Sequence, residues 1–383
     1  MLDLLLEEIG SVYDHFPHTS RKIFLVDEEF VGDSSSFSVT ERALDVSSTL
    51  HAHGFRWETS ARVDQVYRPD SDAEWHVERM RFWTALRKNG LDRCLFGIES
   101  GVDSILRRFN KKTTAAQNVY ALRLLTACGI PIRCTYITFD QLMTMDELVE
   151  SYLFQGRTDV LLKPIENPDF EELFAAIHDE DFIDRQKTGL PMYSQIPYML
   201  VSMECLIGSP YLRRVEAAGL AGEVRTSMGR RNAVFQNPVI GLMSDCSQRW
   251  IDRNFSFDYT LKSMEKITSG EERMFVRRLR YLLKESSYRV LGEMLFLVMR
   301  NPLLQRASGD GLEVEPQSYQ PEAAEASRDI FMKLMESLFG ALVANIDSEL
   351  NNSRSLLISD RRQVLLQQAD RWRCRTSWEL INA

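Results

Sequence analysis

The chain has 383 residues, of which 44% are apolar and 26% are charged, so it can bury a full core and carry a second region. Its formal net charge of -9 argues against a broad phosphate-binding face, so nucleic acid is a poor candidate partner. No apolar run reaches the roughly 20 residues of a membrane helix, and the leucine-rich start carries acids without an early basic residue. We therefore expect a cytoplasmic protein with no membrane partner.

The first predicted elements are a helix, a strand and a second helix. Apolar residues recur at helical spacing over residues 2–13, which indicates an amphipathic helix. The short apolar run that starts at residue 22 ends in acids, among them Asp27 and Glu28, and is typical of a buried strand with carboxylates at its C-terminal end. A Gly- and Ser-rich loop then leads to a helix over residues 40–52.

Two further strands follow in the same pattern. Residues 55–64 alternate like a strand and end near Arg62, and residues 75–88 form the next predicted helix. Residues 91–99 are an apolar run that ends on Glu99 and is followed at once by turn residues. In barrels of repeated strand-helix units, side chains at the C-terminal ends of the strands face the reaction space, so Glu99 is a site candidate. The alternative is that Glu99 caps the next helix or pairs with a nearby Arg.

The middle of the chain repeats this alternation. Thr114 and Gln117 form a capping box, which predicts a helix start, and residues 132–139 form a fourth strand that ends at Asp140. A fifth strand is predicted over residues 198–206. Strands that alternate with helices imply a parallel sheet with right-handed crossovers, and hence an α/β fold.

The C-terminal part is predicted to be helical. Long helices are expected over residues 275–300 and 330–346, separated by an acidic linker near 301–321 that is rich in helix-breaking residues. We therefore place a barrel-like region at residues 1–265 and a helical region at 266–383. A basic patch within the first long helix is interpreted as a solvated face; it consists of Arg277, Arg278 and Arg280.

Cysteine and histidine spacings give little sign of a metal site. The six cysteines form no Cys-x-x-Cys pair, which excludes a ribbon-type zinc site and a thioredoxin-like motif. We expect most of them to be small buried hydrophobic residues. His51 and His53 are a weak metal signal without a third ligand nearby, and we expect them in a solvated loop.

Several segments together resemble the radical S-adenosylmethionine (SAM) enzymes, in the subgroup that often carries a cobalamin domain upstream. The resemblance covers roughly residues 1–265 and depends on the order and spacing of motifs that are weak singly. The motifs are FLVDEEF at 24–30, WETSARVD at 57–64, FGIESG at 96–101, NKK at 110–112, YITFD at 136–140 with Thr144, and GSP at 208–210.

This resemblance implies a partial (β/α)6 barrel and a set of cofactors. Family members hold a [4Fe-4S] cluster with a Cys-x3-Cys-x2-Cys loop, and the cluster cleaves SAM reductively to give a 5'-deoxyadenosyl radical. By carry-over, Asp27 or Glu28 would hold the SAM amino group. Ser60, Arg62 and Glu99 would face SAM or substrate. Cobalamin-dependent methyl transfer is a further option that the subgroup allows.

The sequence departs from the family at the cluster loop. No three cysteines have the required spacing, so we expect this chain alone to hold no cluster and supply no metal ligand. The predicted strands correspond to the second to sixth of the family, and the first is absent. The strand that starts at residue 22 should therefore lie at an open, apolar sheet edge.

Three explanations fit this departure, and three functions follow. The chain could belong to a longer or split enzyme, be a natural cluster-less relative, or have a start set too far downstream. In the first and third cases, an upstream polypeptide or domain would supply the missing strand and cluster for radical SAM chemistry on a small molecule or peptide. In the second case, the chain would be a binding or scaffold subunit. A hydrolase that uses paired carboxylates is the weakest alternative.

Overall fold

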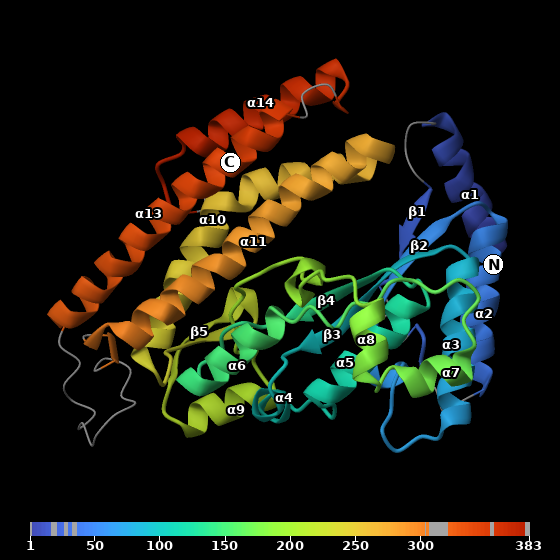
Figure 1. Ribbon diagram of the computed structural model, residues 1–383, viewed down its shortest axis with the longest axis horizontal. Coiled ribbons are helices and arrows are strands. Elements are labelled where there is room, and N and C mark those ends of the chain that lie inside the picture. Colours follow the sequence, from blue (N-terminus) through green and yellow to red (C-terminus); the bar gives the residue numbers. More distant parts are fainter. Residues whose placement is uncertain are drawn as a thin grey trace. The chain divides into compact units, whose positions relative to one another are not determined.

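The computed structural model describes residues 2–16, 21–26, 30–32, 37–302, 304–305, 321–352 and 356–379. The chain divides into two compact units, each built from separated stretches of sequence. The first unit is Met1–Arg107, Lys111–Tyr136 and Phe154–Pro197, and the second is Arg108–Asn110, Ile137–Leu153 and Tyr198–Ala383. Figure 1 shows the elements of both units. The domain boundary near residue 265 stays a prediction.

The first unit contains a four-stranded parallel sheet in the order β1-β2-β3-β4. Its strands are β1 Lys22–Phe24, β2 Arg56–Ala61, β3 Leu91–Glu99 and β4 Ile132–Tyr136. Each strand pairs with the next one along the chain, and helices lie in the connections between them. The α/β class and the parallel strands predicted from the sequence are confirmed, and the arrangement agrees with part of a barrel.

The helices up to residue 195 begin and end largely where local signals place them. They are α1 Leu2–His15, α2 Phe37–Ala52, η1 Val63–Gln65, α3 Ala73–Lys88, α4 Asp103–Arg108, α5 Ala115–Ala127, α6 Met145–Gln155, α7 Phe170–Ala176, α8 Glu180–Gln186 and η2 Met192–Gln195. The predicted capping box at the start of α5 is present, with Gln117 N donating to Thr114 Oγ1 at 3.2 Å. Its reciprocal bond runs from Thr114 N to Gln117 Oε1 at 2.7 Å.

The two faces of the sheet differ in chemistry. One face is fully buried and mostly apolar, and includes Trp57, Phe96 and Cys134. Because side chains alternate along a strand, the residues between these point to the opposite face. That second face is less buried and largely polar; it carries Glu58, Ser60, Arg93, Leu95, Gly97, Arg133 and Thr135. Parallel strands are normally apolar on both faces, so this polar face departs from the usual packing of such a sheet.

Strand β1 lies at an edge of this sheet. It pairs with β2 through Ile23 and Trp57, and no further strand pairs with it among the described residues. Phe24 is 50% exposed and Val26 is 88% exposed, although both are apolar. This agrees with the open, apolar edge predicted from the sequence.

The predicted fifth strand takes a weaker form. Residues 198–206, all of which the structure describes, contain no regular strand. A single parallel bridge joins Phe139 to Ser202, and Met203 N donates to Phe139 O at 2.8 Å. The following segment forms a hairpin that the sequence analysis missed, with β5 Ala221–Arg225 antiparallel to β6 Arg230–Ala233.

The second unit is dominated by long helices, visible in yellow to red in Figure 1. They are α10 Pro238–Ile267, α11 Gly270–Arg300, α13 Pro321–Asn352 and α14 Ser359–Cys374, and the short helix α9 Pro210–Ala217 precedes them. The predicted helices 275–300 and 330–346 lie within α11 and α13, whereas most of the predicted linker lies outside the described residues. In the part of the chain that is described, no helix is long and apolar enough to span a bilayer.

Buried charges and aromatic rings hold these helices together. The Arg253 guanidinium lies 3.9 Å from the ring centre of Phe339 and 4.5 Å from that of Trp378. Arg280 is also buried and bonds to Asp258 and Glu265, so the interpretation of 277–280 as a solvated patch is wrong for this residue. Helical periodicity turns it inward, and two acids compensate its charge.

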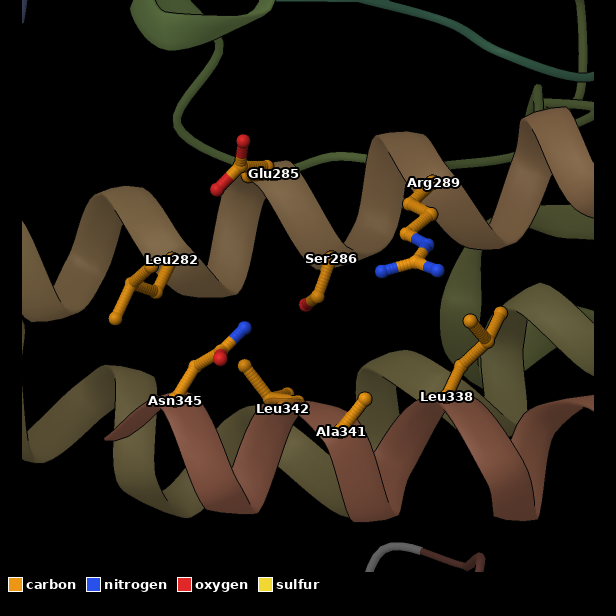
Figure 2. A pocket seen from close by; sticks show the side chains of 8 residues that line it. All are labelled: Leu282, Glu285, Ser286, Arg289, Leu338, Ala341, Leu342 and Asn345. Carbon is orange, nitrogen blue, oxygen red and sulfur yellow. The ribbon is translucent and has the colours of Figure 1, made fainter. Parts of the chain in front are cut away.

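A small cavity of about 180 Å³ lies between α11 and α13. Figure 2 shows its lining, with Glu285, Ser286 and Arg289 on α11 facing Leu342 and Asn345 on α13. This volume suits a few waters better than a drug-sized ligand.

Candidate functional site

The C-terminal ends of β2 and β3 bring the predicted site residues of the described sheet to one region. Ser60 pairs in register with Leu95, and Ala61 pairs with Phe96. Arg62 directly follows β2, and Glu99 is the last residue of the neighbouring strand β3. Ser60 lies on the polar face, and Arg62 begins the turn η1. Three of the predicted residues therefore gather at the edge where a parallel sheet normally carries its ligands.

Glu99 has an unusual backbone and a basic partner. Its φ is 61°, in the left-handed region that side chains other than Gly rarely adopt, and the β3–β4 register shifts between Gly97 and Glu99. Lys111 Nζ donates to Glu99 Oε1 at 3.2 Å. Pairing of Glu99 with a nearby Arg was one alternative expected from the sequence. The structure shows an ion pair of Glu99 with Lys111. A strained backbone at a strand end is a frequent mark of a functional site.

Arg62 is anchored in its own turn. Its Nε donates to Asp64 Oδ1 at 3.1 Å, and its backbone N donates to Gln65 Oε1 at 3.0 Å. The side chain of Arg62 remains 58% exposed despite the ion pair with Asp64. Such an exposed pair is weak, so the guanidinium can exchange its partner for a ligand carboxylate or hydroxyl.

Asp27 and Glu28, the residues predicted to hold the SAM amino group, lie outside the described residues. Their contribution to the site therefore stays a prediction.

A charge cluster that sequence reasoning missed lies on the same polar face, toward the N-terminal ends of the strands. Arg93 Nη2 donates to Glu58 Oε2 at 2.7 Å, and Lys22 forms ion pairs with Glu58 and Asp92. Burial raises the pKa of Glu58, but the Lys22 hydrogen bond and the Arg93 charge outweigh it and lower the pKa below its ordinary value. The signal in the sequence is charged residues inside two strands, Glu58 in β2 and the pair Asp92 and Arg93 in β3. This cluster lies away from the ends that carry ligands and stabilises the sheet.

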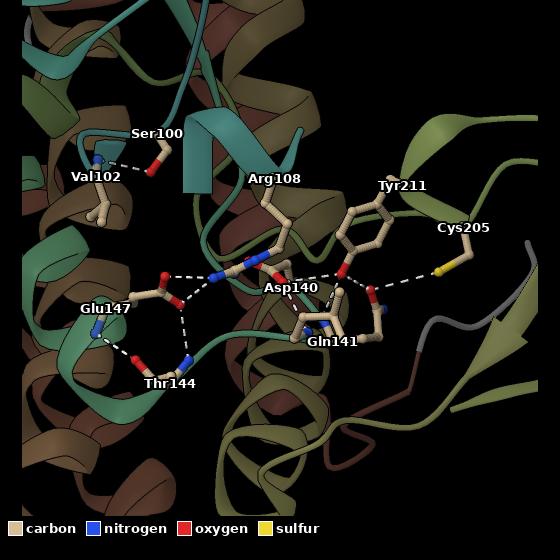
Figure 3. Close-up of polar contacts among 10 residues, drawn as sticks. Ser100, Val102, Arg108, Asp140, Gln141, Thr144, Glu147, Cys205 and Tyr211 are labelled. Atoms are coloured by element: carbon tan, nitrogen blue, oxygen red, sulfur yellow. Dashed lines mark hydrogen bonds and ion pairs between the residues drawn. The ribbon is translucent and has the colours of Figure 1, made fainter. Parts of the chain in front are cut away.

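Asp140, the acid expected at the end of the fourth strand, belongs to a closed network in the second unit (Figure 3). Arg108 Nη1 donates to Asp140 Oδ2 at 2.7 Å, and Arg108 Nη2 donates to Glu147 Oε2 at 2.6 Å. Tyr211 Oη donates to Asp140 Oδ1 at 3.1 Å. Burial raises the pKa of Asp140, and the charge of Arg108 opposes this rise. The polar atoms of these side chains find their hydrogen-bond partners within the network. We therefore interpret the network as one that stabilises the fold.

The thiols do not fit an iron–sulfur cluster. All six cysteines are free, and Cys94, Cys134, Cys205 and Cys246 are buried. Burial raises the pKa of the Cys94 thiol well above its usual value, which disfavours the thiolate that a cluster requires. Among the described residues, no three His, Cys, Asp or Glu side chains converge on a point that could hold a metal ion. The described residues therefore offer no set of ligands for such a cluster.

Comparisons with known proteins give consistent results. No model of a protein family matches the chain. The chain is 32% identical to the 4'-phospho-dehydrooxetanocin synthase of Priestia megaterium over 405 aligned residues, which include 99% of this chain and 54% of that protein.

Two solved structures of the cobalamin-dependent S-adenosylmethionine radical enzyme OxsB are also similar, each with 31% identity. The form with aqua-cobalamin and S-adenosylmethionine bound gives a TM-score of 0.74 over 96% of this chain and 52% of that chain. The form with aqua-cobalamin bound gives 0.76 over 96% and 53%. The chain thus spans about half the length of the relatives it matches.

Sequence and fold agree on this homology. Identity of this degree extends over nearly the whole chain, and 96% of the chain superposes on the solved enzyme. The motifs at the ends of β2 and β3 lie within the matched region. The chain is homologous, over nearly its whole length, to about half of a cobalamin-dependent S-adenosylmethionine radical enzyme.

Proposed function

We propose that this chain is the SAM-facing part of a radical SAM enzyme that uses cobalamin. The observation that carries the proposal is the match of 99% of the chain to about half of one enzyme, combined with the polar residues at the ends of β2 and β3. Their hydrogen-bonding groups suit the amino-acid and ribose groups of SAM. Ser60 provides a hydroxyl, Arg62 a guanidinium and Glu99 a carboxylate. SAM supplies, when bound and reduced, the radical that activates an unreactive carbon.

The part of this chain is to bind and orient. Glu99 accepts hydrogen bonds from ammonium or hydroxyl groups, Ser60 donates and accepts, and Arg62 offers a planar donor pair. Holding the ligand on a rigid sheet edge fixes the direction in which its reactive carbon points, and this positioning accounts for a large share of catalysis in such enzymes. The name of the curated relative contains a phosphorylated product, so a phosphorylated small molecule is the first substrate class to test.

The cluster ligands are proposed to come from polypeptide outside this chain. Two observations support this: the buried, dispersed thiols, and the open edge of β1 with Phe24 and Val26 exposed. A further parallel strand added to that edge would cover both side chains and pair the backbone groups that face outward.

Anaerobic reconstitution with excess iron and sulfide tests this part of the proposal. We expect no stoichiometric iron on this chain alone. About four irons per chain would show that thiols described here gather into a cluster and would refute the reading of the cysteines.

The alternative is a cluster-less binding subunit derived from the same barrel. The dispersed cysteines fit it equally well. Calorimetric titration of SAM separates the two, because the enzyme proposal requires SAM binding and the scaffold does not. Under the proposal, Glu99→Gln lowers the affinity by about tenfold, the usual effect of losing one charged hydrogen bond. Lys112→Met, which changes an exposed neighbour, is the control and should leave the affinity unchanged.

A further inference from the structure

The cavity between α11 and α13 lies where two facing rows of side chains leave a gap. It measures about 180 Å³, and the residues that line it recur every three or four positions along each helix (Figure 2). Two short side chains, Ser286 on α11 and Ala341 on α13, lie at its middle, while Leu282 and Leu338 lie toward its two ends. Because the short side chains do not fill the distance between the helices, a space remains in an otherwise packed contact.

The lining of this cavity is apolar at the floor and polar at the rim. Leu338 and Leu342 are buried, whereas Glu285, Arg289 and Asn345 are exposed. A ligand can therefore reach the leucine side chains without any movement of the helices. Leucines beside a space that the protein leaves unfilled lack part of their apolar contacts, and an aliphatic group placed there would restore them.

The charged groups at the rim have few partners within the protein. Glu285 lies four residues before Arg289, the order that favours an ion pair along a helix, yet these two side chains form none. In the part of the chain that the structure describes, Glu285 makes no ion pair at all. Arg289 reaches Glu293 only at 3.9 Å, between side chains that are 60% and 40% exposed, and such a pair is weak. A carboxylate and a guanidinium one helical turn apart are therefore both available to a ligand.

We infer that the cavity between α11 and α13 binds a small aliphatic α-amino acid. The carboxylate of this ligand pairs with Arg289, its ammonium pairs with Glu285, and its side chain covers Leu342. Ser286 already donates its hydroxyl proton to Leu283 O at 2.8 Å, so its oxygen is left to accept a hydrogen bond from the ammonium. A ligand with only one of the two charges would leave the other charge of the rim without a partner.

The size of the cavity limits the side chain of the ligand. A protein cavity of about 150 Å³ can hold one benzene molecule, so a space of about 180 Å³ suits an amino acid of the size of valine or leucine. Glycine would leave the leucine floor uncovered, and tryptophan would overfill the space. All lining residues belong to the second unit, and none of them belongs to the proposed SAM site, so this inference does not depend on the proposed function.

Ligand-observed nuclear magnetic resonance on the whole chain tests the site, with L-leucine as the probe. We expect saturable binding with a dissociation constant on the order of 1 mM, because a small ligand on an exposed site gains little free energy. Isocaproate has the same aliphatic chain without the amino group, and isoamylamine has it without the carboxylate. Each should bind about tenfold more weakly than leucine, because one charged hydrogen bond is lost. Glycine should not compete with leucine.

Variants at the rim and in the gap assign the binding to this cavity. Arg289→Met should weaken leucine about tenfold and remove its advantage over isoamylamine, and Glu285→Gln should remove its advantage over isocaproate. Lys333→Met, which changes an exposed side chain of α13 outside the lining, is the control and should leave the affinity unchanged. Ala341→Leu fills the gap and should abolish binding without lowering the midpoint of thermal unfolding.

The opposite results are equally specific. Equal binding of leucine, isocaproate and isoamylamine would overturn the inference, and so would leucine binding that persists undiminished in Arg289→Met or in Ala341→Leu. Absence of leucine binding up to about 20 mM would also overturn it. None of these results bears on the proposed function, which the SAM titration tests separately.

Discussion

Two ion pairs that follow strand-like segments show why an acid after a strand is not in itself a site. In the second unit, Asp140 is completely buried and accepts from Arg108, Tyr211 and its own turn. In the first unit, Glu99 meets Lys111 over an open glycine and stays partly exposed. The first pair has its hydrogen-bonding capacity filled by the protein, whereas the second keeps capacity for a ligand. The contrast predicts that mutations at the first affect folding and mutations at the second affect binding.

The largest effect is expected at Arg108. Arg108→Met leaves Asp140 buried without its cation, which should lower the free energy of unfolding by about 3–5 kcal/mol. Urea denaturation followed by circular dichroism measures this loss, with Arg107→Met on the exposed side of the same helix as the control. A loss below about 1 kcal/mol would show that the network does not stabilise the fold appreciably.

The two glycines on either side of Glu99 give the next contrast. A Cβ on Gly101 would lie 1.8 Å from Phe154 Cγ, whereas a Cβ on Gly97 meets only the ends of side chains and a hydroxyl. Gly101→Ala should therefore cost about 1–3 kcal/mol of stability through overpacking. Gly97→Ala should cost much less, and thermal unfolding of both variants compares them. Equal losses would mean that the space above Gly97 is as tightly packed as that at Gly101.

A second closed cluster in the second unit should respond to acid. Burial raises the pKa of Glu265, but hydrogen bonds from Arg277 and Arg280 outweigh it and lower the pKa to about 2, from an ordinary value of 4.5. A depressed folded-state pKa stabilises the protein above the ordinary value, and this contribution is lost as the pH falls from about 4.5 toward 2.

Glu265→Gln should remove this acid-dependent part, about 2 kcal/mol after allowance for partial solvent screening. Urea titrations at pH 7 and pH 3 would show the difference between the two proteins shrinking at the lower pH. An equal difference at both values would exclude Glu265 as the titrating group.

The smallest effect on stability is expected at Glu99. Glu99→Gln removes a partly exposed ion pair, worth about 0–1 kcal/mol, so unfolding should change little while ligand affinity falls. Chemical denaturation of this variant beside Arg108→Met compares the ion pair of Glu99 with the ion pair of Asp140 directly. A large loss of stability at Glu99 would place it with Asp140 as a structural residue.

Local signals in the sequence predicted much of this fold. The four strands β1 to β4 and the Thr114 capping box follow from short patterns of apolar and capping residues, which act over a few positions. The hairpin of β5 and β6 was missed because its strands are short and mostly exposed, so they lack the apolar alternation of a buried strand. The segment 198–206 has strand-like composition, but its pairing is limited to two isolated bridges, Phe139 with Ser202 and Leu206 with Arg230.

The candidate residues were predictable as ends of strands, and their contacts were not. Glu99 was singled out because it ends an apolar run, whereas Ser60 and Arg62 were named through the family resemblance. Lys111 as the partner of Glu99 was not predicted, because the contact depends on a left-handed backbone at Glu99 and on the turn after α4. Nothing in residue type alone distinguishes Asp140, which is closed off by Arg108, from Glu99, which is not.

The most direct test of the account is an equilibrium titration of SAM into the unmodified chain and into Glu99→Gln. The account predicts saturable binding at a single site, weakened about tenfold by the substitution while Lys112→Met matches the unmodified protein. Saturable binding of equal strength in all three proteins, or no binding in any of them, would contradict the placement of the SAM site at the end of β3.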